Sequence, residues 1–291
     1  MLAIGLTLFH PSRDQVDDIV RRYAGSPHPV LAFDNGGLGP VDRMKLDAAG
    51  VRLLSADTNV GIAAALNAVV EAAARRGADA VLLLDQDAQV GPEMVGALAD
   101  ARDRLRAENR PCAVVGPLPG RADDAAKPPR FRQRPGQATV GTLVPVEFLA
   151  TSGSLIDVAA FRAVGPFRAD YFIDGVELEW CFRAWSAGYG SWMARETTIG
   201  HRVGRGTIRA LGIETPRQPL FRMATYLRNS VYGWRLRHIP LAWKLRQIAY
   251  LPLQTMLYWR DSGYRPAVLR RLARAMVDGF RGRLGRPADA P

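Results

Sequence analysis

The sequence has few cysteines and nothing that resembles a secretory leader. Cys112 and Cys181 are its two cysteines, and their spacing is not that of zinc ligands. This argues against a disulfide framework and against a zinc site, and we expect both thiols to be buried. The first ten residues are apolar but carry no basic leader and no small-residue cleavage site. We therefore expect a β-strand there, and a chain that stays in the cytosol.

The sequence also lacks an uninterrupted apolar run that could cross a bilayer. Residues 239–259 have the length, but Lys244, Arg246 and two glutamines interrupt them. We expect this segment to lie in the membrane interface rather than to span the membrane.

Acidic residues become scarce after residue 204. Residues 205–291 contain 17 Lys and Arg but only 4 Asp and Glu, whereas residues 1–204 contain 22 Lys and Arg and 24 Asp and Glu. The C-terminal part therefore accounts for the whole net charge of +11. Its arginines alternate with Trp, Tyr and Leu, which favours contact with an anionic membrane surface. A solvated basic face and packing against a second subunit are the alternatives.

The Gly-x-Gly-x-x-Gly signature of nicotinamide-binding dehydrogenases is absent, since the first apolar run continues as LFHPSRDQ. What the chain does have is an alternation of strand-like and helical patterns. The expected strands are residues 3–9, 29–34, 51–56 and 80–85, and the expected helices are residues 13–24 and 61–77. This βαβ pattern predicts a parallel sheet with its ligand beyond the carboxyl ends of the strands. Residues 120–137, rich in Pro, Gly and Arg, predict a loop.

Polar residues follow several of the predicted strands, and the run VLLLDQDAQVGP ends one of them with two carboxylates. Asp85 and Asp87 are one residue apart, so their charges repel each other near neutral pH. A bound divalent cation or a basic partner would relieve that repulsion. An ordinary strand-ending turn is the alternative, because Asp is common where strands stop.

Seven segments in a fixed order carry a resemblance to a known family: LTLFHP, FDNGG, TNVGIAAALN, LLLDQDA, TSGSLI, FIDGVELEWCFRAWSAGY and IGH. Over about residues 1–235 the sequence resembles the inverting family-2 glycosyltransferases, most closely their bacterial rhamnosyltransferase branch. The resemblance implies an α/β GT-A fold, Rossmann-like and nucleotide-sugar-binding, with a mainly parallel central sheet. It implies a catalytic domain at 1–215, with a donor half at about 1–110 and an acceptor half at about 138–215. Basic amphipathic helices would follow at 216–291.

The resemblance also implies a nucleotide-sugar donor whose diphosphate is neutralised by Mn²⁺ or Mg²⁺. The implied metal ligands are Asp85, Asp87 and His201. The implied donor-binding residues are Thr7, His10, Asp34, Asn35, Asn59, Gly61, Asn67 and Asp85. Asp34 would bond the pyrimidine edge, which uracil and thymine share. The segments DQD, TSGSL and FIDGVELE favour dTDP-L-rhamnose, with a galactosyl, galactofuranosyl or glucosyl donor carried on UDP as the alternative.

For the catalytic base, the resemblance points to Glu177 in ELEWCFRA, with Asp174 as the runner-up because the family more often has Asp at the base position. A purely local alternative is an N-terminal capping box formed by Asp174 and Glu177. The implied acceptor-side residues are Ser152, Gly153, Glu179 and Trp180. The acceptor would be a lipid-linked glycan, such as one on polyprenyl diphosphate, or a polysaccharide or O-antigen precursor. The enzyme would then be peripheral on the inner face of the cytoplasmic membrane, with a homo-oligomer as an open alternative.

Two rival classes fit the residues less well. Phosphatases of the haloacid dehalogenase type also use Asp-x-Asp after a strand, but normally on the first strand and followed by Thr or Val. Here the pair follows a later strand, and Ala88 comes after it. A non-enzymatic nucleic-acid binder would account for the basic tail but not for the ordered polar residues at the strand ends.

Overall fold

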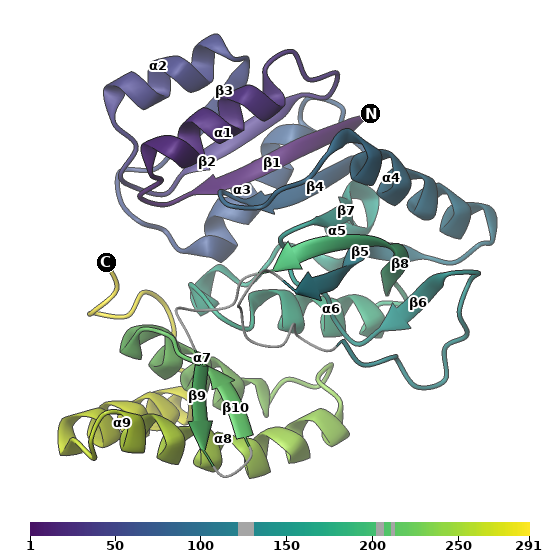
Figure 1. Cartoon of the computed structure of the whole chain (residues 1–291). Helices are drawn as coiled ribbons and strands as arrows, with labels where there is room; N and C mark the ends of the chain where they lie inside the picture. Colours follow the sequence, from purple (N-terminus) through teal and green to yellow (C-terminus); the bar gives the residue numbers. More distant parts are fainter. Residues whose placement is uncertain (122–130, 202–206, 211–212) are drawn as a thin grey trace.

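The computed structural model describes the chain except for residues 122–130, 202–206 and 211–212. One α/β body carries helices on both faces of a central sheet, and a layer of C-terminal helices lies below it in Figure 1. The sequence-predicted strands at 3–9, 29–34, 51–56 and 80–85 and the helices at 13–24 and 61–77 are all confirmed within a few residues.

The strands are β1 (Leu2–Leu8), β2 (Val30–Asp34), β3 (Val51–Ser55), β4 (Ala80–Asp85), β5 (Cys112–Arg121), β6 (Leu143–Val146), β7 (Ser154–Asp157), β8 (Gly190–His201), β9 (Thr207–Ala210) and β10 (Ile213–Pro216). The helices are α1 (Arg13–Tyr23), α2 (Pro40–Ala48), α3 (Ile62–Ala74), α4 (Pro92–Ala107), α5 (Val158–Val164), the short 3₁₀ helix η1 (Ala169–Tyr171), α6 (Val176–Ser186), α7 (Leu220–Gly233), α8 (Leu241–Asp261) and α9 (Pro266–Arg281).

The central sheet has the order β3-β2-β1-β4-β7-β5-β8-β6. Its first four strands are parallel, so their carboxyl ends meet at one edge. Strand β7 enters antiparallel between β4 and β5, which makes the second half of the sheet mixed. The apolar run of β4 is buried as far as Leu84, as expected for a strand covered on both faces. Asp85 is therefore the first residue of β4 that can reach solvent.

A hydrophobic core lies on each face of the sheet. On one face α1, α2 and α4 pack through apolar residues such as Ile19, Leu46 and Leu98. On the other face α3, α5 and α6 contribute residues such as Val69, Phe161 and Trp180. The two faces alternate along each strand, so that Val81 and Leu83 belong to one core while Leu82 and Leu84 belong to the other. Both predicted buried thiols are confirmed as free and buried.

The C-terminal helices have a third core of their own, which includes Leu227, Leu257 and Leu272. Helices α7 and α9 cross closely at Gly279, where an added Cβ would come within 2.3 Å of the Arg228 carbonyl oxygen. Among the described helices, none is both long and apolar enough to cross a membrane. The C-terminal helices pack together around this third core and form a layer below the α/β body in Figure 1.

Candidate active site

The site forms at the carboxyl-end edge of the parallel strands, where Asp85 follows β4. The backbone N–H of Asp85 donates to Ser152 Oγ at 3.2 Å, and the N–H of Gly153 donates to the carbonyl oxygen of Leu83 at 2.8 Å. Gly153 has φ +83°, and a Cβ there would meet the Ile199 side chain at 2.8 Å. The structure thus brings the predicted Ser152-Gly153 segment directly against the end of β4.

The surroundings of the Asp85 carboxylate disfavour its negative charge. Burial and, next in size, the nearby charge of Asp87 together raise the pKa of Asp85 to about 6. Arg222 and the Ser152 hydroxyl act in the opposite direction. Asp87 itself is exposed. A positive charge placed between the two carboxylates would stabilise both in their ionised forms.

The carboxylate-bearing loop, residues 172–175, lies between η1 and α6 and carries Asp174; its backbone conformation is unusual. Phe172 and Asp174 both have positive φ, at +63° and +65°, and Gly175 follows at +80°. Such conformations cost free energy for non-glycine residues and persist only where the surroundings impose them. Here Asn229 of α7 imposes them, because its side-chain N–H groups donate to the carbonyl oxygens of Tyr171, Ile173 and Asp174 at 3.0, 2.9 and 2.9 Å.

The capping-box alternative for Asp174 and Glu177 is not what the structure contains. Helix α6 starts after Gly175, and no side chain caps it. The carboxylate of Asp174 instead accepts from Arg222 of α7, at 2.6 Å from Nη2 and 3.3 Å from Nε. Burial raises the pKa of Asp174, and the Arg222 guanidinium only partly opposes that rise. Asp174 is therefore committed to an ion pair.

Glu177, in the first turn of α6, forms no ion pair among the described residues and lines the same cavity as Asp174. Burial raises its pKa to about 7. Its own backbone and Arg222 lower the pKa, while the charges of Asp174 and Asp85 raise it. A carboxylate with a pKa near neutrality can hold and release a proton at physiological pH, which is the requirement for a general base.

The predicted donor-binding residues of the second strand line the adjoining edge. Asp34 is 2% exposed; it accepts from the N–H of Gly36 at 2.9 Å and forms an ion pair with Arg43. Asn35 Oδ1 accepts from the N–H of Val60 at 2.8 Å. Strand β2 is thereby tied to the loop that leads into α3. Thr7 is buried at the end of β1, and His10 follows it with φ +45°.

The loop before α3 connects the donor side to the carboxylate-bearing loop. Asn59 Oδ1 accepts from the N–H of Gly61 at 2.9 Å, and the Asn59 amide donates to the backbone oxygen of Pro291. Gly61 has φ +81°, and a Cβ there would lie 2.6 Å from the Phe172 carbonyl oxygen. The predicted residue Asn67 lies further along α3, where its amide exchanges two 2.8 Å hydrogen bonds with the backbone of Phe167.

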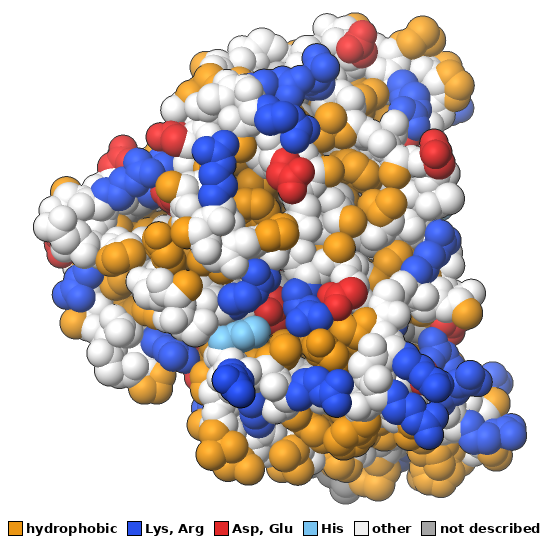
Figure 2. Space-filling model, turned by 180° about the vertical axis from the view of Figure 1, so that it is seen from behind, with side chains coloured by type: hydrophobic (Ala, Val, Ile, Leu, Met, Phe, Trp, Pro, Cys, Tyr) orange, Lys and Arg blue, Asp and Glu red, His pale blue; other side chains and the backbone are white. Residues whose placement is uncertain are grey.

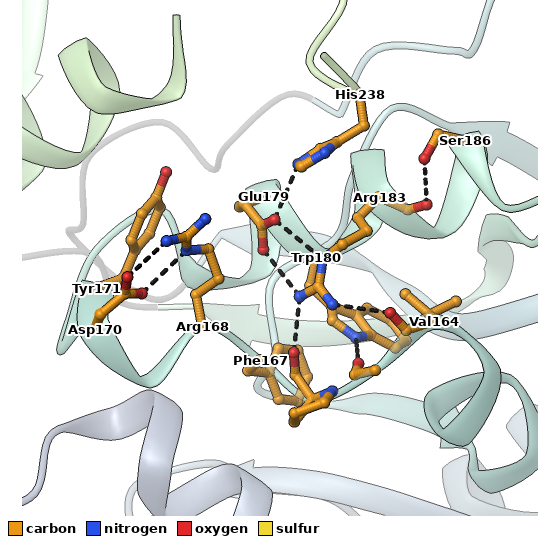
Figure 3. Close-up of polar contacts among 12 residues, drawn as sticks. Val164, Phe167, Arg168, Asp170, Tyr171, Glu179, Trp180, Arg183, Ser186 and His238 are labelled. Atoms are coloured by element: carbon orange, nitrogen blue, oxygen red, sulfur yellow. Dashed lines mark hydrogen bonds and ion pairs between the residues drawn. The ribbon is translucent and has the colours of Figure 1, made fainter. Parts of the chain in front are cut away.

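Two of the predicted acceptor-side residues are buried and hydrogen-bonded within the chain, and Glu179 also lines the cavity described below. Trp180 is fully buried, and its Nε1 donates to the Gly165 carbonyl oxygen at 2.8 Å, so its side chain belongs to the core and does not reach the cleft. Glu179 is 1% exposed and lies between Arg183, at 3.0 Å, and His238 Nε2, at 2.9 Å (Figure 3). Burial alone would raise the pKa of Glu179, but His238 and Arg183 hold it below its usual value.

A cavity of about 800 Å³ extends from Asp174 and Glu177 toward the C-terminal helices. Much of its wall is aromatic. The aromatic lining residues are Phe148, Tyr171, Tyr226, Trp234, Trp243 and Tyr250. Such a cavity suits a ligand with apolar faces and a few polar groups.

The donor set fits a divalent cation in part. Asp85 and Asp87 offer the hard oxygen ligands that Mg²⁺ and Mn²⁺ prefer, and their mutual repulsion would be relieved by the ion. Within the described residues no group of three or more metal-ligating side chains occurs. The third predicted ligand, His201, is the last residue of β8, and its side chain lies outside the described residues.

Two residues that complete this site were not singled out in the sequence. Arg222 and Asn229 both come from α7, where they are one basic and one amide residue in a segment full of arginines. No spacing pattern distinguishes them from their neighbours. Their roles follow from tertiary packing, which lays α7 across the entrance to α6.

No protein-family model matches this chain. The dTDP-rhamnosyl transferase RfbF of Shigella flexneri is 24% identical to it, over 96% of this chain and 95% of its own. The N-acetylglucosaminyl-diphospho-decaprenol L-rhamnosyltransferase of Mycobacterium tuberculosis is 26% identical over 88% of this chain and 90% of its own.

Among solved structures, residues 1–349 of S. aureus TarS in complex with UDP-GlcNAc superimpose with a TM-score of 0.62 at 12% identity, covering 96% of this chain and 80% of that one. GalNAc-T7 with UDP, GalNAc and Mn²⁺ gives a TM-score of 0.52 at 14% identity, covering 91% of this chain and 58% of that one. These likenesses confirm the fold predicted from the sequence.

Proposed function

We propose that this chain, a glycosyltransferase of the GT-A fold that resembles the family-2 rhamnosyltransferases, transfers L-rhamnose from dTDP-L-rhamnose to a lipid-linked precursor of a cell-surface polysaccharide. The observation that carries the proposal is the proximity of Asp85, Glu177 and Asp174 to Arg222, which lowers the pKa of Asp85 and of Glu177 and donates a hydrogen bond to Asp174. Asp85 comes from the end of β4, Asp174 from the loop before α6, Glu177 from α6 and Arg222 from α7.

In the proposed reaction Glu177 is the base. Its carboxylate accepts the proton of the acceptor hydroxyl as that oxygen forms a bond to the anomeric carbon of the donor sugar. The bond from the anomeric carbon to the diphosphate breaks on the opposite face, the electron pair leaves with the diphosphate, and the configuration at the anomeric carbon inverts. The pKa of about 7 keeps a large fraction of Glu177 ionised at neutral pH.

The remaining residues bind and orient. Asp174 and Arg222 form the ion pair that borders Glu177, and the Arg222 charge favours the ionised form of the base. Asp34 and Asn35, buried at the end of β2, would bind the donor nucleotide, Asp34 through the pyrimidine edge. Asp85 and Asp87, with His201 as the third predicted ligand, would hold Mn²⁺ or Mg²⁺. That ion would supply positive charge against the donor diphosphate.

The acceptor follows from the cavity beyond Glu177 and from the relatives. The name of the mycobacterial relative gives it a sugar on decaprenyl diphosphate as acceptor. An aromatic cavity that begins at the base would accommodate the sugar of such an acceptor, because aromatic faces pack well against sugar rings. An enzyme with a lipid-linked acceptor would work at the cytoplasmic face of the membrane.

A UDP-sugar is the second candidate donor. The structure that superimposes with the TM-score of 0.62 contains UDP-GlcNAc, and uracil and thymine offer Asp34 the same edge. Under this alternative the family, the base and the metal site are unchanged, and only the sugar and nucleotide differ.

Calorimetric titration of the purified protein with dTDP, UDP and GDP tests the proposal. We expect binding in the presence of Mn²⁺ that prefers dTDP and is lost when EDTA removes the ion. A preference for UDP would replace the donor but keep the enzyme class. Absence of binding to all three nucleotides would refute the proposed function.

A further inference from the structure

Helix α8 has an exposed apolar face that runs from Leu241 to Met256. Its large members are Leu241, Leu245, Ile248 and Met256, with exposed fractions of 68%, 57%, 49% and 47%. The first three are separated by four and three residues, and Met256 follows Ile248 by eight residues, about two helical turns. This spacing places them on one side of the helix. The residues between them on that side are the exposed Ala242, Ala249 and Pro252.

No described part of the chain covers this face. Surface helices normally present polar residues to water, and a contiguous exposed apolar patch marks a surface for interaction with a partner or a membrane. Figure 2 shows hydrophobic side chains gathered along the lower edge of the molecule, where the C-terminal helices lie, with Lys and Arg side chains beside them. On α9, Val277 and Phe280 are also exposed, at 43% and 59%.

The charge around the face is strongly positive. Between residues 241 and 281, eight Lys and Arg face two Asp. Lys244 and Arg260 belong to α8 itself. A partner that combines an apolar interior with negative charge at its surface would satisfy both properties, and an anionic lipid bilayer is such a partner.

The opposite side of α8 faces the catalytic cleft. Trp243, Gln247 and Leu253 line the cavity that begins at Glu177. Tyr250 also lines it while remaining 36% exposed, so the cavity reaches the edge of the apolar face. One helix therefore separates the exposed apolar face from the acceptor cavity.

We propose that the α8 face, defined by Leu241, Leu245, Ile248 and Met256, lies in the interfacial layer of an anionic bilayer and so presents the acceptor cavity to a lipid-linked substrate. The inference deepens the proposed function and rests on its lipid-linked acceptor. It names the surface that touches lipid and the helix that connects that surface to the base.

The test uses the full-length protein and two double variants. Leu245→Glu with Ile248→Glu places two charges on the α8 face. Val41→Glu with Met44→Glu is the matched control, because both residues are exposed and apolar, at 61% and 64%, but belong to α2 of the α/β body. All four positions are exposed, so we expect the thermal unfolding temperature to stay unchanged in both variants.

The measurement is co-sedimentation with vesicles of phosphatidylglycerol and phosphatidylcholine or of phosphatidylcholine alone. We expect the wild-type protein and the α2 control to bind the anionic vesicles and to bind the neutral ones at least tenfold more weakly. The α8 variant should lose at least tenfold of its binding to anionic vesicles. Equal binding by the α8 variant and the wild type, or equal binding to both lipids, would overturn the proposal.

Two further measurements distinguish this proposal from a failure of the proposed function and from the formation of a dimer. The α8 variant should bind dTDP with Mn²⁺ as tightly as the wild type does. If the proposed function is wrong, the wild type and both variants will all fail to bind the nucleotide, independently of the result with vesicles. Light scattering should give the same mass for wild type and variant. A dimer that the α8 variant splits would assign the face to a second copy of the chain and overturn the lipid assignment.

Discussion

At the scale of single residues, Glu177 and Asp174 show how environment assigns different tasks to neighbouring carboxylates. Both are buried acids with a raised pKa, but only Asp174 is held by a guanidinium at hydrogen-bonding distance. Asp174 therefore serves as the partner of Arg222, and Glu177 keeps its carboxylate available. This division supports the sequence-based choice of Glu177 as the base over Asp174.

We predict that Glu177→Gln keeps donor binding but lowers kcat by about 10²–10⁴-fold, the usual contribution of a general base. Glutamine is nearly isosteric and cannot accept the proton. Calorimetry with dTDP and Mn²⁺, together with steady-state rates of sugar transfer, checks both parts. Full activity in this variant would reassign the base.

The acid limb of the pH profile gives a second, independent check on Glu177. The base must be ionised, so kcat/KM should fall about tenfold per unit as the pH drops below about 7 and level off above it. Because Arg222 lowers the pKa of Glu177, Arg222→Gln should move this limb to higher pH. Arg222→Lys keeps the positive charge and should return the limb toward its wild-type position. Measuring kcat/KM of the wild type, Arg222→Gln and Arg222→Lys between about pH 5.5 and about 9 tests this prediction.

We predict that Asp87→Ala abolishes metal-dependent donor binding and lowers transfer by roughly a thousandfold or more, since a bound metal contributes several kcal/mol to charge stabilisation. The exposed position of Asp87 makes the substitution harmless to the fold. Titration of dTDP with and without Mn²⁺ measures the effect. An unchanged response to Mn²⁺ in the variant would place the ion elsewhere.

At the scale of elements, helix α7 organises the carboxylate-bearing loop from outside the catalytic body. Its Asn229 donates to three carbonyl groups in and directly before that loop, those of Tyr171, Ile173 and Asp174, and Arg222 holds the Asp174 side chain. The start of α3 contacts the same loop, since the N–H of Ile62 donates to the Phe172 carbonyl oxygen at 2.8 Å. Elements far apart in the sequence thus fix one backbone conformation.

We predict that Asn229→Ala destabilises the protein by about 1–3 kcal/mol, because buried carbonyl groups lose their donor. It should also lower kcat by about 10–10²-fold, because a misplaced base loses its alignment with the acceptor. Urea unfolding and transfer rates measure the two effects.

The control for this prediction is Val231→Ala on the same helix, where a buried side chain of the C-terminal core is shortened without touching the loop. It should reduce stability but leave kcat of the folded protein close to that of the wild type. Equal losses of kcat in both variants would show that Asn229 acts only through stability.

At the scale of the whole molecule, the predicted donor site joins residues from β2, from β4 and from the α3 loop, whose Asn59 also contacts Pro291. A ligand that binds only the folded arrangement stabilises it by mass action. We predict that dTDP with Mn²⁺ at about one hundred times its dissociation constant stabilises the protein by ~2.7 kcal/mol and raises Tm by several degrees. Differential scanning calorimetry measures the increase, and Asp87→Ala should remove it. A Tm that does not respond to dTDP would contradict a preformed nucleotide site.

The sequence by itself determined the parallel half of the sheet and the position of Asp85 at its edge. Alternating apolar runs and Ala-rich helical segments are local patterns, and a strand that is buried on both faces must end where carboxylates begin. The same ordered motifs predicted Ser152 and Gly153, which the structure places against Asp85. Because β4, its turn and its neighbours obey short-range rules, they could be predicted without coordinates.

Tertiary structure alone decided what surrounds the base. Trp180 follows Glu179 in the same acidic motif, yet helix geometry turns its side chain into the core, where Phe161 and Phe167 cover it. Arg222 and Asn229 reach the site because α7 lies against the loop that precedes α6, a contact between residues about fifty positions apart. Such contacts depend on how completed elements dock, and no local pattern in the sequence encodes which arginine of a basic segment will face a carboxylate.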